Sequence, residues 1–155
     1  PLLPVLLSYI LSFIYLGIYW NNHHHLLHAA EKITGGVLWK NLHLLFWLSL
    51  VPFVTAWMGE NHFAPATMSI YGIVLLMAGV AYWVLQRQLM RVNGKNSVLT
   101  RAVGKDLKGK ASPFLYLLGI FSAFSNEWIS GGIYLFVALM WLIPDTRIER
   151  IINKE

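Results

Sequence analysis

The sequence contains no cysteine and few charged residues. Asp, Glu, Lys and Arg together make up 12% of the 155 residues, whereas soluble domains carry about 25%. The absence of cysteine excludes disulfides and thiolate metal sites. Residues 2–20, 42–58 and 66–85 contain no Asp, Glu, Lys or Arg at all. Each run is close to the roughly 20 residues that a helix needs to cross a bilayer core, so the sequence predicts an all-α integral membrane protein.

Five transmembrane helices are predicted within a single domain of residues 1–155. They cover residues 2–20, 36–57, 66–86, 113–124 and 128–143. Pro52 is expected to kink the second of them. The last two are predicted to form a hairpin, because one continuous helix would bury Glu127 in lipid at a high cost.

Residues 87–112 are predicted to form a basic cytoplasmic loop. Seven of the twelve Lys and Arg residues lie between Arg87 and Lys110, and cytoplasmic loops of membrane proteins are rich in both. Within this loop, residues 92–110 form either an amphipathic helix on the leaflet, capped by Ser97, or a solvated linker. Basic and aromatic residues do not interleave as nucleic-acid binding requires, so the predicted partner is the lipid bilayer and not a nucleic acid.

The distribution of charge also predicts an orientation. A cytoplasmic basic loop places the tail, residues 145–155, inside and the start of the chain outside. We therefore expect one further N-terminal helix before this sequence, which would give a six-helix bundle with both termini inside.

Four histidines follow the first predicted helix: His23, His24, His25 and His28. If the helix continues through them, Trp20, His24 and His28 share one face. Three interpretations remain open: a structural hydrogen-bond network, a metal site in which Glu31 joins His24 and His28, or a sensor of cytoplasmic pH. The sequence contains no HExxH pattern and no evident pair of nucleophile and base, so we predict that the protein is not an enzyme.

His43 adds a further alternative. A b-type haem between two helices needs two axial histidines at matched depth. His43 with His24 or His28 would meet that requirement, so a haem-binding electron-transfer protein is one alternative function. A membrane scaffold without transport is another.

Four short segments resemble a known family. They are YWNNHHH at residues 19–25, LWKNL at 38–42, VPFV at 51–54 and LMWLIPDTRIER at 139–150. In this order they are similar to bacterial homologues of the lysosomal potassium channel transmembrane protein 175. The resemblance implies a homotetramer of six-helix subunits in the bacterial plasma membrane, with K⁺ as the permeating ion and no cofactor.

The same resemblance implies how the site is built. The pore would be lined by a first helix that this sequence lacks, so no ion-contacting residue is named. Trp20, His23, His24 and Asn41 are the residues implied to form the network that holds the pore helix near the cytoplasmic side. The function expected on this basis is that of a potassium-selective leak channel.

Overall fold

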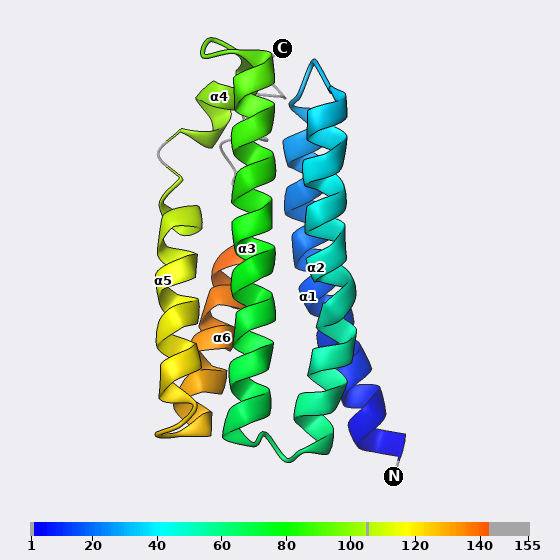
Figure 1. The fold of residues 1–155 in the computed structure, drawn as a ribbon, viewed down its shortest axis with the longest axis vertical. Coiled ribbons are helices and arrows are strands. Elements are labelled where there is room, and N and C mark those ends of the chain that lie inside the picture. The colour runs from blue at the N-terminus through cyan, green and yellow to red at the C-terminus, as the bar shows by residue number, and fades with distance from the viewer. Residues whose placement is uncertain (1, 105, 143–155) are drawn as a thin grey trace.

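The regular structure of this chain is helical throughout the residues that the computed structural model describes, 2–104 and 106–142. Three long helices, α1 (Leu2–His28), α2 (Gly35–Glu60) and α3 (Pro65–Asn93), run side by side (Figure 1). The short helix α4 (Val98–Val103) lies across one end of the bundle, and α5 (Leu107–Ser122) and α6 (Glu127–Leu142) pack beside the other half. The all-α prediction is therefore confirmed.

The helices differ in how well they match the dimensions of a membrane. Within the described part of the chain, α2 with 26 residues and α3 with 29 are the two helices that are long enough and apolar enough to cross a bilayer. Helix α6 is apolar but has 16 residues, fewer than the roughly 20 of a straight span. The number of five transmembrane helices therefore stays a prediction. Pro52 lies inside α2, which continues past it to Glu60.

Helices α1 and α3 run well past their predicted C-terminal ends. Helix α1 continues past residue 20 to His28, through all four histidines. Helix α3 continues past residue 86 and includes Arg87 and Arg91 before it ends at Gly94, whose φ of 89° favours glycine. The predicted basic loop of residues 87–112 is thus largely helical, since α5 already begins at Leu107. Arg and Gln favour the extension of α3, because both have high helix propensity.

Helix α4 corrects the interpretation of the segment between α3 and α5. The Ser97 hydroxyl caps it as predicted and accepts a hydrogen bond from the Thr100 backbone N–H at 3.2 Å. Its apolar residues Leu99 and Val103 are buried in one cluster with Leu26 and Leu85 of α1 and α3. The apolar face of this short helix therefore closes the end of the bundle and does not lie on lipid.

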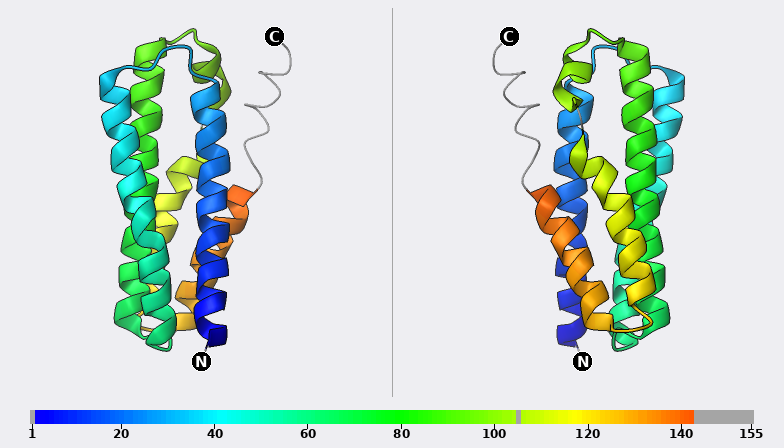
Figure 2. Two further views of the ribbon diagram at one scale, coloured as in Figure 1. Left: turned by 90° about the vertical axis from the view of Figure 1, so that its right-hand side faces the viewer. Right: turned by 90° about the vertical axis from the view of Figure 1, so that its left-hand side faces the viewer.

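Helices α5 and α6 form the predicted hairpin. Both views in Figure 2 show them antiparallel, with their turn at the same end of the bundle as the α2–α3 turn. Asn126 starts α6, because its Oδ1 accepts hydrogen bonds from the backbone N–H groups of Trp128 and Ile129 at 2.9 and 3.3 Å. Residue 143 and the predicted cytoplasmic tail, residues 145–155, lie outside the described residues.

Tyr134 of α6 holds this hairpin against the long helices. Its hydroxyl donates to the Met68 carbonyl at 3.2 Å, and its own carbonyl accepts a hydrogen bond from the Tyr15 hydroxyl at 2.7 Å. The ring lies directly against Gly72 and Gly119, where a Cβ atom would overlap it. The Tyr134 ring of α6 thus packs against both α3 and α5, and this close packing requires a glycine on each of those two helices.

Candidate functional site

A hydrogen bond joins α1 to α2 at two of the residues that the sequence singled out. His23 Nε2 lies 2.6 Å from Asn41 Oδ1, and both side chains are half-buried. With the amide oxygen facing the ring, His23 Nε2 carries the proton and donates it. The continuation of α1 past residue 20 is what places His23 opposite α2. The structure thus joins two of the four residues that the resemblance implies, while their role toward a pore helix stays a prediction.

Trp20 and His24 lie apart from that bond, on the outer surface of α1. The Trp20 ring stacks on His24 with centroids 5.4 Å apart, and His24 stacks on His28 at 6.0 Å. All three side chains are exposed, Trp20 to 65%. The predicted shared face of Trp20, His24 and His28 is confirmed, and we call it the α1 aromatic ladder. The structure brings together His23 with Asn41 and Trp20 with His24, but it does not join the two pairs.

The structure gives no support to the metal and haem alternatives. Within the described ranges, no three His, Cys, Asp or Glu residues are grouped closely enough to hold a metal ion. His43 is exposed, and its Nε2 accepts a hydrogen bond from Trp47 Nε1 at 3.0 Å, so the lone pair that would bind haem iron is engaged. The histidines proposed as axial ligands therefore lie on outer surfaces.

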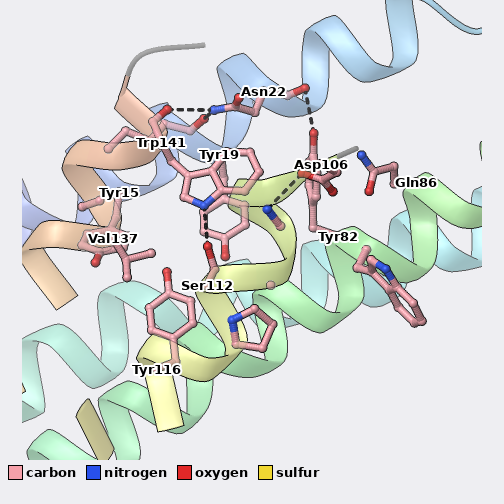
Figure 3. Close-up of a pocket in the computed structure, with 16 residues that line it drawn as sticks. Tyr15, Tyr19, Asn22, Tyr82, Gln86, Asp106, Ser112, Tyr116, Val137 and Trp141 are labelled. Carbon is pink, nitrogen blue, oxygen red and sulfur yellow. Dashed lines mark hydrogen bonds between the residues drawn. The ribbon is translucent and has the colours of Figure 1, made fainter. Parts of the chain in front are cut away.

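Asn22 is a buried polar residue whose importance the sequence did not reveal. Its Nδ2 donates to the Ile18 carbonyl at 2.9 Å and to the Trp141 carbonyl of α6 at 3.2 Å (Figure 3). Its own carbonyl accepts a hydrogen bond from the Tyr82 hydroxyl of α3 at 3.2 Å. One residue thus connects three helices. The available signal was an asparagine on the inward face of an otherwise apolar helix.

The bonds continue from α6 to α5. Trp141 Nε1 donates to Ser112 Oγ at 2.8 Å, and Ser112 Oγ donates to the Lys108 carbonyl at 2.8 Å. The indole that borders Asn22 is therefore fixed from both sides. This chain of bonds anchors the start of α5 to the end of α6.

A small pocket lies among these four helices. It has a cavity volume of about 40 Å³ and is partly open to the surface. Aromatic rings from α1, α3, α5 and α6 form part of its wall, and Asn22, Gln86, Asp106 and Ser112 contribute polar groups (Figure 3). Because a buried water needs roughly 10–15 Å³ by this measure, the cavity admits only a few non-hydrogen atoms. The pocket therefore presents a few hydrogen-bonding side chains within a mainly apolar wall.

Comparison with known proteins identifies related chains. The family described as endosomal/lysosomal potassium channel TMEM175 matches residues 1–52, the segment that contains Trp20, Asn22, His23, His24 and Asn41. A potassium channel of Chryseobacterium sp. (strain P1-3) is 51% identical over 150 residues, which cover 97% of this chain and 78% of that protein. A potassium channel of Streptomyces collinus (strain DSM 40733 / Tue 365) is 29% identical over 87 residues, which cover 52% of this chain and 42% of that protein. No solved structure shows significant similarity.

Proposed function

The chain belongs to the TMEM175 potassium channel family, and we propose that it is a subunit of a channel that passes K⁺ passively across a membrane. The observation that carries the proposal is the 51% identity with the Chryseobacterium potassium channel across 97% of this chain. The long apolar helices α2 and α3 support a membrane location. The proposed channel is a leak, with no cofactor and no catalytic step.

The proposed pore is formed by four copies of the subunit around a helix that is not among the residues of this chain. Two observations support the additional helix. About a fifth of the Chryseobacterium channel lies outside its match to this chain, which is enough length for such a helix. In addition, the α1 aromatic ladder is exposed and contacts no other described helix through a hydrogen bond. An exposed row of large rings beside a half-buried His–Asn pair is a surface suited to a packed helix.

In this proposal, Trp20, His23, His24 and Asn41 hold the pore helix near its cytoplasmic end. The bond between His23 and Asn41 fixes the spacing of α1 and α2, and the ladder supplies a flat aromatic surface. The protein would lie in the bacterial cell membrane with the basic end of the bundle, which includes Arg91 and Arg101, toward the cytoplasm.

The proposal is tested by ion flux through the full-length protein in liposomes. With K⁺ inside and Na⁺ outside, the wild type should collapse the K⁺ gradient without ATP or a proton gradient, and much faster than it passes Na⁺. Protein-containing liposomes whose K⁺ loss matches empty liposomes would overturn the channel. Equal K⁺ and Na⁺ rates would overturn its selectivity.

The supporting role of Asn41 has a matched control in Asn61. Asn41→Ala should reduce K⁺ flux or the fraction of tetramer in native mass spectrometry, because His23 then loses its partner on α2. Asn61 lies at the opposite end of α2 and is exposed, with its Nδ2 bonded only to its own helix at the Trp57 carbonyl. Asn61→Ala should behave as wild type. If both variants keep wild-type flux and assembly, Asn41 does not have the proposed role.

A further inference from the structure

Helices α5 and α6 extend along only part of α3. Each has 16 residues and a length of about 24 Å, whereas the 29 residues of α3 extend over about 43 Å. Figure 1 shows both short helices beside the part of α3 that begins at Pro65, and neither reaches the end at Asn93. The surface that α5 and α6 form is therefore much shorter than the long helix behind it.

Exposed apolar side chains cover the outer side of these two helices. On α5 they recur every three or four residues, so they share one side of the helix. We call the following set the short apolar face: Phe114, Leu117 and Phe121 of α5, with Leu135, Phe136 and Leu139 of α6. Exposed apolar surface of this extent is typical of contact with a membrane.

Polar residues bound the short apolar face at both ends. Asn126 and Glu127 are exposed at the turn between the two helices. At the other end, Lys110 is exposed one helical turn before Phe114, on the same side of α5. From Lys110 to its C-cap Ala123, α5 rises about 20 Å. This length is about 10 Å less than the hydrocarbon core of a typical bilayer.

A contact between α5 and α3 shows how deep Lys110 lies. The Ser69 hydroxyl donates a hydrogen bond to the Ile120 carbonyl at 3.2 Å, so these two residues are level. The α2–α3 and α5–α6 turns lie at one end of the bundle, so α3 and α5 run in opposite directions (Figure 2). Lys110, ten residues before Ile120, is therefore level with about residue 79 of α3. Exposed Trp83 lies about 6 Å closer to the basic end, and Arg87, the first charge on α3, about 12 Å closer.

The chain that leads into α5 is also unsuited to lipid. Gly104 and Asp106 are non-helical, with φ of 52° and 31°, and Gly104 is exposed. Exposed non-helical backbone does not occur in hydrocarbon, because its N–H and C=O groups have no partners there. Water or lipid headgroups must therefore reach this connection.

We propose that the short apolar face contacts a locally thinned bilayer, in which the cytoplasmic leaflet ends at the level of Lys110. The inference rests on the membrane location in the proposed function. A bilayer adapts to an apolar stretch that is shorter than its hydrocarbon core by thinning beside it. The partner of this face is thus lipid whose acyl chains cover about 20 Å at α5 and about 30 Å at α3.

The test is the reaction of single cysteines with a membrane-impermeant maleimide. The full-length protein is placed in lipid nanodiscs, where the reagent reaches both sides. This sequence contains no cysteine, and the unsubstituted protein is labelled in parallel as a blank. Lysine can extend its charge to water from a deeper position. Cysteine is too short to do so, and its thiolate forms in water and not in hydrocarbon.

Lys110→Cys should react roughly tenfold or more faster than Trp83→Cys. A flat bilayer predicts the opposite order, because Trp83 lies closer to the cytoplasmic end. Ile73→Cys, at an exposed position near the middle of α3, is the control and should stay unreactive. Acyl chains are then lengthened from about 16 to about 22 carbons, which should slow the reaction of Lys110→Cys as lipid covers it.

A second measurement does not depend on cysteines. Thermal unfolding of the wild type is measured across the same lipids. Leu107 is exposed one turn before Lys110, so Lys110→Leu extends the apolar stripe of α5. This variant should move the most stabilising lipid to a bilayer thicker by about 5 Å, one helical turn. Lys95→Leu, between α3 and α4 and also exposed, should leave that optimum unchanged.

Three results would overturn the proposal. A faster reaction of Trp83→Cys than of Lys110→Cys would show that the leaflet is not thinned at α5. A Lys110→Cys rate that ignores acyl-chain length would identify a water-filled crevice or a contact with a second copy. Rapid reaction of Ile73→Cys would overturn the membrane location itself, and this inference with it. The first two results leave the channel proposal intact, because neither depends on K⁺ flux.

Discussion

The aromatic residues inside the bundle and those on the outer face of α1 are used in opposite ways. Inside, Tyr15, Tyr82, Tyr134 and Trp141 each donate a hydrogen bond to another helix, at distances of 2.7 to 3.2 Å. Outside, the rings of the α1 aromatic ladder stack along their own helix and stay exposed. The fold thus gives each of these four interior rings a hydrogen-bond partner on another helix. The outer positions are ordered but have no partner on another helix in the described part of the chain.

This difference separates stability from assembly. A buried ring with a bonded hydroxyl or N–H contributes both apolar area and a satisfied polar group, so its loss should destabilise the subunit itself. An exposed stack contributes little to the subunit, because its surface stays in solvent or lipid. The exposed stack would stabilise the assembly only when another helix covers it. Substitutions at both kinds of position test that separation, in order of expected effect.

The largest effect is expected at Gly72. A Cβ at this position would overlap the Tyr134 hydroxyl and the Ile120 side chain, and the Tyr134 ring also lies directly against Gly119. Gly72→Leu should lower the free energy of unfolding by about 3 kcal/mol or more, and Gly72→Ala by about 1–3 kcal/mol, as overpacking does. Unfolding followed by circular dichroism in detergent measures both.

Gly132 is the control for Gly72. It lies within α6, and a Cβ there would meet no atom within 4 Å. Gly132→Ala should leave stability unchanged or raise it slightly, because alanine has the higher helix propensity. If Gly72→Ala proves as harmless as Gly132→Ala, Tyr134 is not fixed as described, and the contrast between inside and outside weakens.

Asn22 should have the next largest effect. Asn22→Leu removes the donor to the Trp141 carbonyl and leaves that partly buried group without its partner on α1, at a cost of about 1–3 kcal/mol. Its neighbour Asn21 is only partly buried and does not line the pocket described above, so Asn21→Leu should change stability by less than about 0.5 kcal/mol. Equal effects in thermal unfolding would mean that Asn22 does not connect the helices.

The sequence predicted the helices well but not their ends. Runs without charge mark the apolar centres of α1, α2 and α3, because burial or lipid contact requires them to be apolar. The ends extend further, since His23 to His25, Arg87 and Arg91 interrupt the apolar pattern without breaking a helix. Local chemistry sets some of these boundaries, as at Gly94 after α3, Ser97 before α4 and Asn126 before α6.

The candidate site was predictable only in part. The likeness of short segments to a channel family pointed to His23 and Asn41, which the structure brings together. Asn22 was missed because its partner Trp141 lies 119 residues away, and no local pattern reveals such a contact. Burial, which only the fold shows, gives Asn22 its meaning.

The smallest effect on the subunit is expected where α1 meets the outside. A double-mutant cycle of His23→Ala and Asn41→Ala should give a coupling energy of about 1 kcal/mol, as their bond is half-buried.

Trp20→Ala, at an exposed position, should cost the isolated subunit less than about 0.5 kcal/mol. If the ladder packs against the pore helix, the same Trp20→Ala should nonetheless reduce the tetramer fraction or K⁺ flux. A Trp20 variant that destabilises the subunit as strongly as Asn22→Leu would remove the distinction, because the ladder would then belong to the core. Unchanged assembly and flux would leave the ladder a lipid-facing surface.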